Sequence, residues 1–184
     1  MNLWLRLLWL RLRTPFRPRV GIEDVGRMPM RVWPSDLDVL GHVNNGVYLT
    51  MMDLGRTDLM LRSGAWKRMV DAGIYPVVAS QTISYRKSLD PWVRFTLETR
   101  LVGADDRATY IEQRFVVDGE IYARAHVRAR FLRKSGGTVP IAEMLEVAGS
   151  DGLPAPAPWV AEWADDVALP PTKAPAPSVW DGEA

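Results

Sequence analysis

The chain has 184 residues, 47% hydrophobic and 24% charged, and this composition suits one globular domain with a core. Its net charge of +1 gives no overall field to attract nucleic acid, so no nucleic-acid partner is expected. The absence of cysteine excludes disulfides, thiolate metal sites and cysteine nucleophiles. The two histidines, His42 and His126, lie far apart in the sequence, so neither a histidine-rich metal site nor any other metal or redox cofactor is expected.

The first 16 residues form a segment ahead of the main domain. Residues 1–13 combine leucine and tryptophan with arginine and stop before Pro15. As a helix they would be roughly 20 Å long, too short to cross a hydrocarbon core of about 30 Å. Arg6 breaks the apolar run and no small-residue cleavage site follows closely, so the segment is also a poor signal peptide. Two interpretations stay open: peripheral contact of residues 1–13 with a membrane, or packing on the domain or a second subunit.

The segment 35–48 concentrates polar side chains directly before an apolar helix. It reads S-D-L-D-V-L-G-H-V-N-N-G-V-Y. Polar groups at this density are costly unless they bind or transform something, although Asx and Gly residues also cap helices and form turns. Residues 46–62 then predict a helix that is apolar on more than one face. Such a helix is expected to be largely surrounded by protein.

The remaining core predicts strands. We expect a short extended run at 30–33, a second helix at 66–72, and strands at 77–85, 93–102, 108–117 and 121–131. The last of these alternates apolar and polar residues, which is typical of a strand with one buried face. Short turns between the strands indicate an antiparallel meander. The predicted class is therefore α+β, with a sheet that covers or wraps one long helix.

After Gly149 the composition changes to alternating proline and alanine, which indicates a tail and not a second domain. Pro158 is suited to begin a short helix within this tail. The predicted division of the chain is an apolar and basic N-terminal helix at 1–16, a core domain at 17–148 and a C-terminal tail at 149–184.

The loop from Asp36 to Tyr48, of the type D-x-D-x-x-G-H-V-N-N-x-x-Y, resembles the active-site loop of the hotdog-fold thioesterases, in particular the 4-hydroxybenzoyl-CoA thioesterase-like branch. The order of elements from Arg31 to Leu132 is similar to a hotdog domain, an antiparallel sheet around one central helix. Residues 33–38, 80–89 and 101–110 resemble the thioesterase superfamily member 6-like group. The resemblance implies an acyl-CoA or acyl-ACP thioesterase of lipid metabolism that assembles as a homodimer or homotetramer.

Thioester hydrolysis needs an activated oxygen and hydrogen-bond donors for the oxyanion. By its place in the motif, Asp38 corresponds to the family's catalytic carboxylate and would act as base or nucleophile, with an Asx turn or helix cap as the alternative role. Asp36 lies two residues away, would point elsewhere in an extended loop, and is expected to brace it. Asn45 and Gly46 lie where the first helical N–H groups are unpaired, so they are expected to bind the oxyanion.

Three more loop residues are candidates for substrate binding. Asn44 offers an amide to the loop or the substrate, and His42 would contact the acyl group or bond to backbone. Tyr48 lies on the helix behind the loop, where packing and supporting hydrogen bonds are expected, as they are for Asp53 paired to an arginine. His126 is expected to be structural. Arginines on the strands are candidates for the phosphates of CoA: Arg86, Arg128 and Arg130.

Two other functions stay open. One is a non-catalytic, membrane-associated hotdog protein that binds acyl thioesters. The other is a hydroxyacyl-thioester dehydratase, which normally needs a histidine and a carboxylate converging across the subunit interface; the near-adjacent Asp38 and His42 do not obviously supply that arrangement. The expected location is the cytoplasm, with or without peripheral contact with a membrane.

Overall fold

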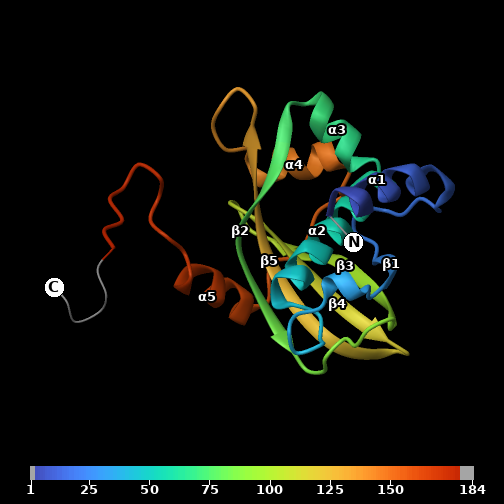
Figure 1. Ribbon diagram of the computed structural model, residues 1–184. Helices are drawn as coiled ribbons and strands as arrows, with labels where there is room; N and C mark the ends of the chain where they lie inside the picture. The colour runs from blue at the N-terminus through green and yellow to red at the C-terminus, as the bar shows by residue number, and fades with distance from the viewer. Residues whose placement is uncertain (1–2, 179–184) are drawn as a thin grey trace.

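A computed structural model shows an antiparallel sheet curved around one long helix, and it describes residues 3–178 (Figure 1). Five strands lie in the order β1-β3-β4-β5-β2. They are β1 (Gly26–Arg31), β2 (Ile74–Tyr85), β3 (Arg94–Ala104), β4 (Thr109–Val117) and β5 (Glu120–Arg133). The long helix is α2 (Asn45–Arg62), and the shorter ones are α1 (Leu3–Arg13), α3 (Ala65–Asp71), α4 (Ile141–Ala148) and α5 (Pro158–Asp166). The predicted α+β class is confirmed.

The core lies between α2 and the inner face of the sheet. The apolar positions of β5 are buried on this face, as their period of two predicts. The helix packs closely on the sheet at Gly55, where a Cβ atom would lie 2.7 Å from Leu97 Cδ2 and 2.8 Å from Thr99 Oγ1. Such close packing fixes the position of α2, and with it the loop that precedes the helix.

Two elements differ from the sequence prediction. Strand β1 begins at Gly26, earlier than the predicted run at 30–33, and includes Pro29. A proline cannot donate to a strand ladder, but β1 is an edge strand and tolerates it. Helix α4 was not predicted, because it is short and Pro140 stands at its start without a side-chain cap. It lies beside α3 at one end of the sheet (Figure 1).

The two edges of the sheet differ. Strand β1 has six residues, contains a proline and lies near α1. Strand β2 has 12 residues and pairs only with β5 within the described chain. A long edge strand with an unpaired row of backbone groups is commonly completed by another strand.

Helix α1 packs on the domain through one side only. Leu10 is 1% exposed and belongs to the main core, and Arg6 is 5% exposed. Leu7 is half-buried and packs against the same core, whereas five other large apolar side chains of the helix are exposed, among them Trp4, at 74%. Both interpretations of this segment therefore keep support: it docks on its own domain and still presents an apolar surface. In the described part of the chain, no helix is long and apolar enough to cross a membrane.

Helix α5 of the C-terminal segment packs on the outer face of the sheet, opposite α2. Helix α5 begins at Pro158 as predicted, and its Val160 and Ala164 pack against Ala108 and Tyr110. Met1, Asn2 and residues 179–184 of the predicted segments lie outside the described residues. The division at 16 and 148 stays a prediction.

Candidate active site

The loop before α2 folds into a tight turn at the surface. Leu37 and Val43 form an isolated antiparallel bridge at its base. Between them, the Asp38 N–H donates to the His42 carbonyl over 2.8 Å, and the Gly41 N–H donates to the Asp38 carbonyl over 3.1 Å. Gly41 has a φ of +82°, a conformation that favours glycine, and this accounts for the glycine of the motif.

Asp38 is half-buried, and its carboxylate is held from one side. Its Oδ1 accepts hydrogen bonds from the Leu40 N–H at 2.9 Å and the His42 N–H at 3.4 Å. Within residues 3–178, its Oδ2 has no hydrogen-bond or ion-pair partner. The Asx-turn role foreseen as an alternative is therefore real, yet it occupies only one oxygen. The other remains available for chemistry.

Asp36 has a different environment, although it lies only two residues away. It is 2% exposed and forms an ion pair with the buried guanidinium of Arg6 on α1. Its Oδ2 also accepts from the Trp33 N–H at 2.8 Å, and its backbone carbonyl accepts from the Asn44 N–H at 2.9 Å. Asp36 thus braces the loop, as the sequence predicted, and connects α1 to the residue that caps α2.

The first turn of α2 offers the expected backbone donors, with one qualification. Asn44 is the N-cap, and its Oδ1 accepts from the Gly46 N–H at 2.8 Å. The Asn45 N–H has no acceptor among the described residues. Asn45 therefore presents the ready donor, and the Gly46 N–H can reach a substrate oxygen only if the Asn44 side chain rotates away.

The three candidate substrate-binding residues are not equally accessible. His42 and Asn44 are exposed beside Asp38 and the helix start. Tyr48 is buried, its ring packs edge-on against Tyr85 and Phe115, and its hydroxyl accepts from the Leu89 N–H at 3.3 Å. Burial raises the pKa of the Tyr48 hydroxyl. The geometry gives Tyr48 the packing and supporting role, and leaves His42 and Asn44 facing solvent.

Asp53 forms an ion pair with Arg56, three residues later in α2, as predicted. Arg56 also donates to the buried Gln113 Oε1 over 2.6 Å, and Gln113 in turn donates to the Met52 carbonyl and the Thr99 hydroxyl. Burial lowers the pKa of Arg56, while the Asp53 carboxylate opposes that shift. This network joins α2 to the sheet and accounts for Asp53 without a catalytic role.

His126 is buried on the outer face of β5, where its ring packs edge-on against Trp159 of α5. Its Nε2 lies 3.4 Å from Glu112 Oε2, and burial lowers the pKa of the imidazole. This is the structural role expected of it. Of the three arginines considered for CoA phosphates, Arg86 pairs with Glu120, Arg128 donates to the Ala164 carbonyl, and Arg130 is exposed.

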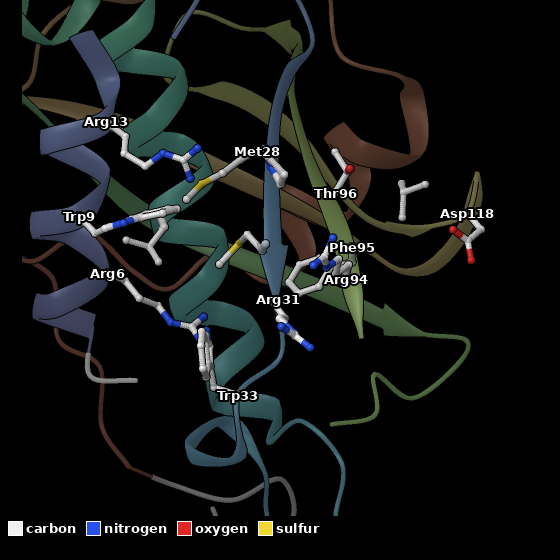
Figure 2. Close-up of a pocket in the computed structure, with 14 residues that line it drawn as sticks. Arg6, Trp9, Arg13, Met28, Arg31, Trp33, Arg94, Phe95, Thr96 and Asp118 are labelled. Atoms are coloured by element: carbon white, nitrogen blue, oxygen red, sulfur yellow. The ribbon is translucent and has the colours of Figure 1, made fainter. Parts of the chain in front are cut away.

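Among the pockets that lie outside this loop, two border the central helix, and the sequence predicts neither. One, of about 350 Å³, is mostly apolar and lies between α2, α3 and the β2 side of the sheet. The other, of about 680 Å³, extends from α1 across β1 to β3 and is rimmed by arginines (Figure 2). None of the loop residues 38–48 lines either one. Their walls join residues far apart in sequence, so no local motif marks them.

Comparison with known proteins identifies the family. The sequence profile of the thioesterase-like superfamily matches residues 32–164. The chain belongs to this superfamily. It is 43% identical over 102 residues to Protein THEM6 of Xenopus laevis, a match covering 52% of this chain and 49% of that protein. It is 36% identical over 137 residues to Protein THEM6 of Danio rerio, covering 72% and 67%. The chain thus spans about half the length of the first relative.

Solved structures show the same fold. A probable thioesterase from Escherichia coli, YbaW, matches with a TM-score of 0.62 and 23% identity, covering 66% of this chain and 94% of that one. A gentisyl-coenzyme A thioesterase matches with a TM-score of 0.59 and 19% identity, covering 65% and 98%. At these identities the likeness concerns the fold alone, and it confirms the predicted hotdog class.

Proposed function

We propose that the chain hydrolyses an acyl thioester of coenzyme A or of an acyl carrier protein. Membership of the thioesterase-like superfamily supports the reaction, and the structural neighbour named as a coenzyme A thioesterase supports the substrate class. The observation that carries the proposal is the Asp38 carboxylate. The loop backbone holds one oxygen, and the other is open beside the start of α2.

Two chemical routes use that open oxygen. As a base, Asp38 takes a proton from water, the oxygen of that water bonds to the thioester carbonyl carbon, and the C–S bond breaks as the thiolate leaves and is protonated. As a nucleophile, Asp38 bonds to the carbonyl carbon itself and forms a mixed anhydride with loss of the thiolate; water then hydrolyses the anhydride. In both routes, the Asn45 N–H would stabilise the oxyanion, assisted by the helix dipole.

A thiol-release assay over a panel of acyl-CoA esters tests the function. We expect turnover that tracks enzyme concentration and disappears in Asp38→Asn. Acyl-CoA affinity without turnover in the unaltered protein would instead establish the non-catalytic binding protein. A single turnover in H₂¹⁸O then separates the routes, because only the anhydride route can place ¹⁸O in the Asp38 side chain.

We further propose that the chain works as a homodimer joined through β2. The motivating observation is that β2 is a 12-residue edge strand without a second neighbour in the described chain. Tyr48, at the start of α2, packs against Tyr85 at the end of β2, with ring centroids 5.0 Å apart. The loop therefore lies close to this edge. A second copy paired there would enclose the candidate active site, which lies open at the surface of one copy.

Multi-angle light scattering at micromolar concentration tests this assembly, and we expect the mass of a dimer or of a tetramer built from dimers. A monomer would contradict the proposed assembly. The variant Gln81→Pro, in the centre of β2, should dissociate the dimer if the β2 edges pair. Gln81 lies opposite Val127, whose backbone groups face away from β2, so the Gln81 N–H points to the free edge and the proline removes a donor there. The opposite edge strand, β1, already contains a proline, Pro29, in the native chain, so this edge is less suited to pair with a second copy.

A further inference from the structure

We propose that α1 and the edge strand β1 together form a docking face for an anionic lipid bilayer. The face consists of the exposed side of α1 with the following 3₁₀ turn (Thr14–Phe16), and of the arginine-rimmed pocket beside it. This surface extends beyond the N-terminal segment onto the sheet, and it is separate from the candidate active site.

The apolar part of the face is already turned outward. Helix α1 buries Leu10 and Arg6 against the domain, so the side that packs is defined. Leu7 is half-buried beside them. The exposed apolar side chains of the helix, together with Phe16 of the turn, are Trp4, Leu5, Leu8, Trp9 and Leu12. A helix of 11 residues is too short to span a bilayer, but its leucine and tryptophan side chains suit a position in the membrane interface.

The charged part lies on the sheet, where Arg31 of β1 is the direct cross-strand partner of Arg94 of β3. Like charges placed opposite each other in a sheet are destabilising. In the described chain neither guanidinium has a carboxylate within ion-pair distance. Arg31 is held by a bond to the Trp92 carbonyl at 3.1 Å and lies over the Trp92 ring. An anionic group between the two arginines would remove the repulsion.

The pocket joins the two parts (Figure 2). Its floor is apolar, with Met28 and Phe95 among the buried residues that line it. Arg13 enters from α1, and Arg31 and Arg94 enter from the sheet. Arg31 follows Met30 and Arg94 precedes Phe95 in their strands, so the two arginines border the pocket from the other face of the sheet, at its β1 edge. Apolar side chains bordered by guanidinium groups match a phosphate headgroup with the first part of its acyl chains.

The charge also argues against a second copy of the chain as the occupant. A two-fold contact through this face would set the same patch against itself. The arginines of one copy would then approach those of the other, with Asp118 as the only acidic residue that lines the described pocket. An anionic bilayer satisfies the apolar and the basic parts together.

Sedimentation with phosphatidylglycerol vesicles, and with neutral phosphatidylcholine vesicles, tests the proposal. Deletion of α1 would be a poor test, because it also removes Leu10 and Arg6 from the core. We therefore compare two exposed double variants, Leu8→Ser with Leu12→Ser and Arg31→Gln with Arg94→Gln. The matched control is Arg124→Gln with Arg130→Gln, which removes the same charge from exposed positions on β5. Melting temperatures establish that each variant is folded.

We expect binding to phosphatidylglycerol vesicles that weakens with salt and exceeds binding to neutral vesicles. Since one arginine at such a surface contributes about fivefold in affinity, the Arg31/Arg94 double variant should bind roughly 25-fold more weakly. The affinity of the Arg124/Arg130 control variant should stay within twofold of that of the unaltered protein. The Leu8/Leu12 variant should lose binding to both vesicle types. Millimolar inorganic phosphate should compete weakly, because it lacks the apolar contacts.

Three results would overturn the proposal. If the Arg31/Arg94 pair binds as the unaltered protein does, the sheet takes no part in docking. An equal loss of affinity in the Arg124/Arg130 control variant would mean that net charge alone, and not this face, determines vesicle binding. Self-association that the leucine variant abolishes, without vesicle binding, would make the face a contact between copies. The measurement is of vesicle binding alone, so its outcome does not depend on thioester hydrolysis.

Discussion

Asp36 and Asp38 lie two residues apart in one loop, yet their environments are opposite. Asp36 is buried, paired with Arg6 and bonded to the loop backbone. Asp38 is half-buried, and the loop engages only one of its oxygens. A buried carboxylate that is paired with a guanidinium holds structure, whereas a half-buried carboxylate with an unengaged oxygen can attack or accept a proton. The comparison teaches that the environment, and not the residue type, separates a brace from a candidate catalytic group.

The largest effect should come from Asp38→Asn. The amide keeps the shape but loses the base or nucleophile, so we expect kcat to fall on the order of 10²- to 10⁴-fold with little change in melting temperature. Asp36→Asn should cost much less activity and more stability. Steady-state thiol release and thermal unfolding measure both variants. If the two ranks in activity are reversed, the roles assigned to the two carboxylates are wrong.

The next largest effect should come from Arg6, the ion-pair partner of Asp36. Arg6→Met should lower the free energy of unfolding by about 3–5 kcal/mol, because it leaves the buried Asp36 charge without its guanidinium partner. Arg11→Met, on the exposed side of the same helix, is the matched control and should change stability by less than about 0.5 kcal/mol. Urea unfolding gives both values. Equal effects would mean that the pair contributes nothing beyond helix packing.

Asn44→Ala separates capping from chemistry at the start of α2. Loss of the N-cap should lower the free energy of unfolding by about 1 kcal/mol. It also frees the Gly46 N–H, which the Asn44 side chain occupies, so we expect kcat to change by only a few-fold. A loss in kcat as large as that of Asp38→Asn would show that the Asn44 side chain itself takes part in the reaction.

The two histidines also differ in burial, since His126 is buried and His42 is exposed. Burial lowers the pKa of His126, so the unfolded chain, with a histidine pKa of about 6.5, binds the proton more readily than the folded one. The free energy of unfolding should therefore fall as the pH drops through about 6.5, and level off below the pKa of folded His126. His126→Gln should flatten this part of the profile. Urea unfolding between pH 5 and pH 8 measures the difference.

Local patterns determined much of this protein. The alternation in β5 identifies its buried face because strand side chains alternate by geometry, whatever lies around them. The loop from Asp36 to Tyr48 could be recognised because its turn, its glycine and its helix cap involve neighbours in the chain. For the same reason the sequence located the central helix to within one residue of its start at Asn45.

The tertiary structure decided what depends on distant residues. Asp36 is a buried brace because Arg6 meets it from 30 positions away. Pro29 lies within a strand because that strand is at the edge, and strand order is not a local property. Arg31 and Arg94 face each other only through the pairing of β1 with β3. Periodicity shows which side of an element is buried, but the partner on that side is set by packing of the whole chain, and the pocket beside α1 follows from it.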